Sequence, residues 1–188
     1  LGNCIHVFFG KDVEVGEFEV KGPAGVAHFV FDEPGHDGEI VYIGTSAKGW
    51  DDRWGGHVDR TRNVHVHHID ASAGYAHSEI ADAKPGTRNG VVEYNTSVGA
   101  VSDPNTGGGT GLHLGGVDGI ARWNVIEESS PTGILVGNWG ETYEEVPDAG
   151  KRNAVYGNRV SGTFENFTEA SSTVRSIKIT DEISEADM

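Results

Sequence analysis

Three stretches in the second half of the chain share one pattern that decides the fold: Gly90-Val-Val-Glu-Tyr-Asn95-Thr-Ser97, Gly119-Ile-Ala-Arg-Trp-Asn124-Val-Ile126 and Asn153-Ala-Val-Tyr-Gly-Asn158-Arg-Val160. In each, a short apolar run leads to an Asn, and the residue two positions after the Asn is Ser, Ile or Val. The three Asn residues follow one another at steps of 29 and 34 residues. A motif that recurs every 20 to 50 residues or so is typical of repeat architectures, so we expect one structural unit per motif.

A second element recurs between these motifs. Thr110-Gly-Leu-His-Leu114 and Thr132-Gly-Ile-Leu-Val136 lie 22 residues apart. Asn63-Val-His-Val-His-His-Ile-Asp70 continues the first motif backwards with His in place of Asn, and Asp12-Val-Glu-Val-Gly-Glu-Phe-Glu-Val20 shows the same alternation. Most of the chain therefore reads as repeated short strands.

Helical periodicity is almost absent. The one stretch with some helical character, Ala73 to Ala83, is interrupted by Gly74 and followed by Pro85. Val- and Ile-rich runs of strand length, bounded by Gly, Asn, Ser and Asp, predict an all-β chain.

The alternation of Gly-Ile/Leu-x-Leu/Val with Ile/Val-x-x-Asn-x-Ile/Val resembles the parallel β-helix repeat of the pectate-lyase-like superfamily, most plainly from Asn89 to Gly162. The resemblance implies a right-handed parallel β-helix, a solenoid of short coils with loop insertions. It also implies that Asn95, Asn124 and Asn158 stack in a corner, with their side-chain amides bonding one another. The alternative is an antiparallel sandwich in which these Asn residues lie in turns.

The solenoid interpretation leads to three further predictions. Val92, Ala121 and Val155, each three residues before a corner Asn, should line the interior as one ladder. Dividing 188 residues by about 27 per coil gives about seven coils. Residues 1–180 should form a single domain, a part of a longer chain or larger assembly, with 181–188 as an acidic C-terminal tail.

Charge excludes some partners. Asp and Glu number 29 against 14 Lys and Arg, which gives a net charge of −15. Such a polyanion repels a phosphate backbone, so we expect no nucleic-acid partner. No apolar run of about 18 residues occurs, so we expect no membrane insertion. The acidic balance indicates a halophilic character, and the one cysteine, Cys4, cannot form an internal disulfide.

Insertions at residues 44–62, 99–110 and 138–152 interrupt the repeat, and such insertions tend to form binding loops. Two of them carry the aromatic residues Trp50, Trp54, Trp139 and Tyr143. Aromatic rings beside carboxylates can stack on and hydrogen-bond sugars, so these four are the predicted ligand-binding residues. The alternative is that the rings hold their own loops against the strands.

Two sets of residues could carry chemistry. Asp51, Asp52 and Asp59, with Arg53 as a cationic group, are candidate catalytic residues for a glycoside-cleaving reaction; a solvated acidic loop is the alternative we favour.

His65 and His67 lie two apart on a predicted strand and so share a face, where Glu93 of the next unit could complete a metal site. Packed or stacked surface histidines are the alternative. No cofactor is required by the sequence, although calcium could bind between acidic loops.

The function favoured by these observations is a non-catalytic extracellular or virion-surface module for structure and recognition. It would bind a glycan or a surface protein through its insertion loops, as a homo-oligomer or in a larger assembly. One alternative is a polysaccharide lyase or glycoside hydrolase of the parallel β-helix type; a second is a purely structural subunit of a surface assembly. A fold does not choose among these functions.

Overall fold

The structure, a computed structural model, describes residues 4–21, 38–72, 79–99, 110–127, 132–138, 143–161, 168–170 and 178–179. The predicted ligand-binding residue Trp139 and the predicted tail 181–188 lie outside these ranges, as does most of the insertion 99–110.

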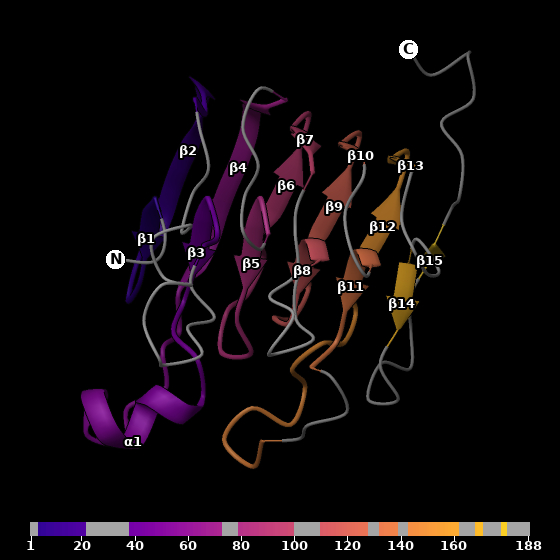
Figure 1. The fold of residues 1–188 in the computed structure, drawn as a ribbon. Coiled ribbons are helices and arrows are strands. Elements are labelled where there is room, and N and C mark those ends of the chain that lie inside the picture. Colours follow the sequence, from indigo (N-terminus) through magenta and orange to yellow (C-terminus); the bar gives the residue numbers. More distant parts are fainter. Residues whose placement is uncertain are drawn as a thin grey trace, which may run out of the picture.

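The strands form two sheets, and all pairings between the described strands are parallel (Figure 1). The first sheet has six strands in the order β1 (Ile5–Val7), β3 (Val41–Ile43), β5 (Ala81–Ala83), β8 (Thr110–Leu114), β11 (Thr132–Val136) and β14 (Thr168–Ala170). The second has nine: β13 (Arg159–Ser161), β10 (Val125–Glu127), β7 (Thr96–Val98), β4 (Arg62–Ala71), β6 (Val91–Glu93), β9 (Ile120–Arg122), β12 (Ala154–Tyr156) and β15 (Lys178–Ile179), with β2 (Lys11–Glu19) paired to β4.

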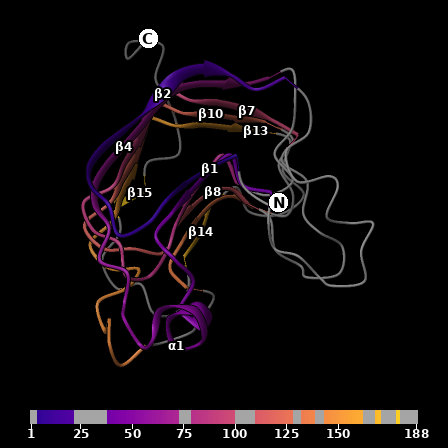
Figure 2. The ribbon, with the colours of Figure 1, turned by 90° about the vertical axis from the view of Figure 1, so that its left-hand side faces the viewer.

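The core lies between the sheets. Seen along the stack, β1, β8 and β14 lie over one another in one layer, and β7, β10 and β13 lie over one another in a separate layer (Figure 2). Val66, Val92, Ala121 and Val155 are in register on β4, β6, β9 and β12, and all four are buried. Because side chains alternate along a strand, this apolar ladder places the neighbouring residues on the outer face.

Stacked Asn side chains hold one corner of the second sheet. The Nδ2 atoms of Asn95 and Asn124 each donate to the Oδ1 atom of the next Asn along the stack, at 2.9 Å in both cases. The backbone N–H groups of Asn95 and Asn124 donate to the same oxygens. The structure thus places Asn95, Asn124 and Asn158 in one buried stack that satisfies backbone donors where the chain bends.

The residue before each corner has a left-handed backbone. His68, Tyr94 and Trp123 have φ values of 49°, 54° and 55°, and Gly157 has 63°. For residues with a Cβ this conformation costs free energy, which the surrounding hydrogen bonds must offset. The side chains of His68, Tyr94 and Trp123 stack on one another at these bends.

The helix α1 (Lys48–Trp54) lies in the first insertion and was not predicted. It is seven residues long, has no side-chain N-cap and ends at Gly55 in the left-handed conformation. No helix among the described residues is long and apolar enough to cross a membrane.

The prediction of an all-β right-handed parallel β-helix of about seven short coils was wrong. One strand per coil would give sheets of about seven strands, whereas the described residues form two mainly parallel sheets of six and nine strands, one helix and no closed barrel. The nine-stranded sheet arises because β4 is long enough to pair with β6 and β7 end to end. An even 27-residue step was also wrong: paired residues lie from 22 residues apart (Leu112 and Ile134) to 51 apart (Val13 and Val64).

Candidate functional site

His65 and His67 lie together on the outer face of β4. Val64 and Val66 of the same strand are buried in the core, so the alternating histidines point away from it. Their ring centroids are 4.4 Å apart. The two imidazoles that the sequence placed on one face are thus in direct contact.

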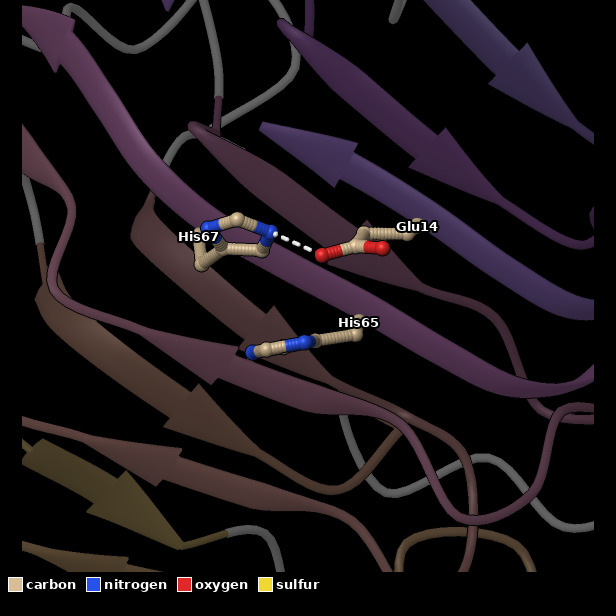
Figure 3. A group of neighbouring side chains, drawn as sticks. All are labelled: Glu14, His65 and His67. Atoms are coloured by element: carbon tan, nitrogen blue, oxygen red, sulfur yellow. Dashed lines mark hydrogen bonds and ion pairs between the residues drawn. The ribbon is translucent and has the colours of Figure 1, made fainter. Parts of the chain in front are cut away.

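Glu14 of β2 joins this pair, and the sequence did not indicate it. Glu14 is in register with His65, and Gly16 is in register with His67. The Glu14 Oε1 atom lies 2.9 Å from His67 Nε2. A dashed line marks this interaction in Figure 3. One ligand atom each of Glu14, His65 and His67 lies within 4.8 Å of the others.

Glu93 was the expected third metal ligand. It lies beside the histidine pair, but the group of three possible ligands contains Glu14 in its place. The Glu93 Oε1 atom is 2.9 Å from His65 Nε2, and the Glu93 Oε2 atom accepts a hydrogen bond from Arg122 Nε. Burial acts to raise the pKa of Glu93, but the hydrogen bonds from Arg122 and His65 outweigh it and hold the pKa below its ordinary value. Glu93 therefore stays ionised and orients the His65 ring.

The polar row continues across two more strands. Arg122 Nη1 donates to the Tyr156 hydroxyl at 3.0 Å, and the guanidinium lies 4.2 Å from the Trp123 ring centroid. The hydrogen bond to Glu93, followed by the one to Tyr156, raises the pKa of Arg122 above its usual range. Arg122 is thus fixed in both position and charge.

An aromatic column runs next to this row. The His68 and Tyr94 rings stack at 5.2 Å, and the Tyr94 and Trp123 rings stack at 4.9 Å. His68 also contacts the histidine pair, because its Nδ1 atom lies 2.9 Å from His67 Nδ1. The sequence contains one signal for this aromatic column: Tyr94 and Trp123 each directly precede a corner Asn.

The predicted loop aromatics have mainly internal contacts. Trp50 is 4% exposed, donates from Nε1 to Thr45 Oγ1 at 3.1 Å and packs on Tyr143 at 5.9 Å. Trp54 contacts the rings of Phe8 and Phe9. Trp50 is not available to stack on a ligand, because its own loops enclose it; Trp54 and Tyr143 are half-buried.

The predicted catalytic carboxylates do not converge. Asp59 is fully buried, and its Oδ1 atom accepts hydrogen bonds from Thr61 and from the Phe9 backbone. Asp51 and Arg53 lie exposed on α1, while the Asp52 side chain is outside the described part of the structure. Asp59 therefore organises the chain around Thr61.

A hollow of about 340 Å³ lies where the first and third insertions meet. Three arginines, Arg60, Arg62 and Arg88, line it together with residues 145–149. Arg60 Nη2 donates to the Glu145 carbonyl at 2.9 Å and so ties the two insertions together. In a chain with a net charge of −15, this is a local concentration of positive charge.

A second carboxylate cluster lies buried at the first sheet. One oxygen each of Glu39, Glu79 and Asp82 lies within 4.8 Å of the others. Burial, followed by the charges of Glu79 and Asp82, raises the pKa of Glu39 to about 8. Asp82 is bound by His113 Nδ1 at 2.8 Å and by Lys84 Nζ. Burial opposes ionisation of Asp82, but these two cations lower its pKa to about 2.

Comparisons of the chain with protein-family models, with curated proteins and with solved structures find no match. The function is therefore inferred from the chemistry of the chain's own residues.

Proposed function

We propose that the chain is a non-catalytic recognition module that binds an acidic glycan in the hollow between its first and third insertions. The observation that carries the proposal is the meeting of Arg60, Arg62 and Arg88 in one concave surface. Guanidinium groups present several donors in a plane and match carboxylate or sulfate groups in a bidentate manner. Uronic acids and sulfated sugars offer such groups along a polymer.

The overall negative charge does not prevent this binding. At physiological ionic strength the Debye length is about 8 Å, so acidic groups farther away are largely screened from the hollow. The acids Glu145 and Asp148 also line the hollow, and Asp118 is 3.5 Å from Arg88. The local field is therefore set by these few groups rather than by the net charge.

Recognition is favoured over catalysis at this place. Arginine stays protonated in proteins, so these three side chains hold a fixed positive charge and do not exchange protons with a substrate. The walls contributed by Pro85, Val117 and Pro147 are apolar, and such surfaces pack against sugar rings. We place the module outside the cell or on a virion, where its acidic surface suits high salt.

The test uses calorimetry to measure binding of the 188-residue chain to oligogalacturonate, to a sulfated glycan and to a neutral glucan. We expect the acidic glycans to bind and the neutral glucan not to bind. Arg62→Gln and Arg88→Gln should each weaken binding about tenfold or more. Arg159→Gln is the matched control, because Arg159 is exposed and pairs with Glu127 on another surface. Equal binding by the Arg62 variant, or preference for the neutral glucan, would refute the proposal.

A further inference from the structure

We infer that Glu14, His65 and His67 form a binding site for a divalent transition-metal ion of the zinc type. The three residues come from two adjacent strands, β2 and β4, and face the same side of the sheet (Figure 3). Two imidazoles and one carboxylate are the ligand types that Zn²⁺ accepts in sites with an open fourth position. This inference does not depend on glycan binding, which concerns a different surface.

The distances fit such an ion after a small adjustment. Ligand atoms around a tetrahedral zinc, at bonds of about 2.0 to 2.2 Å, lie roughly 3.3 to 3.5 Å from one another. Here the three atoms are within 4.8 Å. The Glu14 side chain is 73% exposed, so its carboxylate can move toward the imidazoles. The two rings already lie side by side on a rigid strand.

The contact between His67 and Glu14 requires a positive charge or a proton between its atoms. The lone pairs of Nε2 and Oε1 repel one another at 2.9 Å unless a hydrogen or a cation lies between them. Where His67 Nδ1 donates to His68 Nδ1, the neutral His67 ring has no proton left for Glu14. In that tautomer a metal ion can occupy the place of the proton.

Neighbouring groups hold the ligands as metal sites require. His65 Nε2 faces Glu93, which Arg122 binds in turn, so that His65 Nδ1 is the atom left for a metal. The His67 ring lies against Gly16, where an added Cβ would be 2.9 Å from its Cε1 atom. His67 is buried, His65 is half-buried and Glu14 is exposed, so one side of the site is open to solvent. A water molecule or a ligand could take the fourth position.

The ligand set also selects among metals. Imidazole favours zinc, nickel and copper, whereas calcium prefers six to eight oxygen ligands. Only Glu14 supplies carboxylate oxygen among the three. We therefore expect Zn²⁺ to bind and Ca²⁺ not to compete at equal concentration.

The test is titration of the metal-stripped 188-residue chain with ZnCl₂, measured by calorimetry, and with CoCl₂, measured by visible absorption. We expect one strong site per chain. His65→Gln and Glu14→Gln should each weaken zinc binding at least tenfold and change the cobalt spectrum. Both residues are accessible, so these variants should fold; circular dichroism checks that they do.

His57→Gln is the matched control, because His57 is exposed and lies outside the cluster. It should bind zinc as the wild-type chain does. The inference is overturned by absence of a strong site in the wild-type chain, by unchanged affinity in either cluster variant, by loss of affinity in the His57 variant, or by equal binding of Ca²⁺.

Discussion

The chain carries two clusters of carboxylates with imidazole, one on each sheet, and they differ in their access to solvent. At the second sheet the Glu14 side chain is 73% exposed beside His65 and His67. At the first sheet Glu39 and Asp82 are each 2% exposed. The two clusters therefore differ in what they can do. The surface groups can exchange a proton for a metal ion, whereas the charge of each buried carboxyl group must be neutralised inside the protein.

The buried cluster illustrates both ways of neutralising a carboxyl group. Asp82 stays ionised because His113 and Lys84 surround it, and His113 also contacts the Gly137 carbonyl through Nε2 at 2.7 Å. Burial lowers the pKa of His113, but the charge of Asp82 outweighs this and raises it. Glu39 has acids for neighbours and takes up a proton instead. The exposed carboxylate of the surface cluster is hydrated and needs neither a buried cation nor a bound proton.

The largest effect should follow from breaking the buried ion pair. Asp82→Ala leaves His113 and Lys84 without their shared carboxylate, and removing one partner of a buried pair costs about 3–5 kcal/mol of unfolding free energy. Urea denaturation at pH 7 measures it. Asp51→Ala, which removes an exposed carboxylate of α1, is the control and should change stability by less than about 0.5 kcal/mol. Equal effects of the two variants would show that the buried ion pair stabilises the fold no more than an exposed carboxylate does.

The next effect concerns pH. The pKa of Glu39 rises from its ordinary 4.5 to about 8 in the folded chain. Between these values the folded chain binds more protons than the unfolded chain, so the unfolding free energy should fall as pH rises from about 5 to about 8, by roughly 3–4 kcal/mol. His113, whose pKa is also raised, loses its contribution in the same direction. Glu39→Gln should therefore reduce this slope without abolishing it, in thermal unfolding measured across the range.

Asp82 gives the opposite dependence at low pH, which serves as an internal check. Its pKa of about 2 lies below the ordinary 3.8, so its stabilisation is present above pH 3.8 and is lost as pH falls toward 2. A chain with the Glu39 change should keep this acid limb. Loss of the acid limb in Glu39→Gln would contradict the separate assignment of the two carboxyl groups.

Glu93 connects the surface cluster to the sheet and should give a moderate effect. Glu93→Gln keeps the shape but removes the charge that His65 and Arg122 share, which should cost about 1–2 kcal/mol of stability. Loss of an outer carboxylate that orients a metal-binding histidine typically lowers metal affinity 10- to 100-fold or so. Glu127→Gln, at an exposed Glu–Arg pair of the same sheet, is the control. A full wild-type zinc affinity in Glu93→Gln would show that Glu93 does not orient His65.

The local sequence predicted some features of the fold and of the surface cluster, but it could not predict contacts between distant segments. The shared face of His65 and His67 follows from spacing alone, since alternation on a strand has a fixed period. The stacked Asn corner was expected only from the resemblance to a β-helix repeat. Glu14 lies 51 residues before His65, and its place depends on the register of β2 against β4, which no local pattern encodes. Glu39, Asp82 and His113 likewise come from three separate segments of the chain.

The number of units and the role of the loops were missed for related reasons. The insertions vary in length, so an average step does not give the strand count. The seven-residue α1 contains Gly49 and has no side-chain cap, so its sequence lacks the usual helix signals. Trp50 was expected to face a ligand, but the third insertion packs on it through Tyr143. A contact between two insertions cannot be predicted from the sequence of either insertion alone.

The smallest effect on stability should come from Glu14, and it separates the two clusters most clearly. Glu14→Gln should change the unfolding free energy of the metal-free chain by less than about 0.5 kcal/mol, because exposed ion pairs contribute little. With zinc at 100 times its dissociation constant the wild-type chain should gain about 2.7 kcal/mol, and the variant should gain far less, since it lacks one of three ligands. Urea denaturation with and without zinc measures both quantities. A large cost in the metal-free variant would mean that Glu14 supports the fold as Asp82 does, and the contrast between an exchangeable surface cluster and a structural buried one would fail.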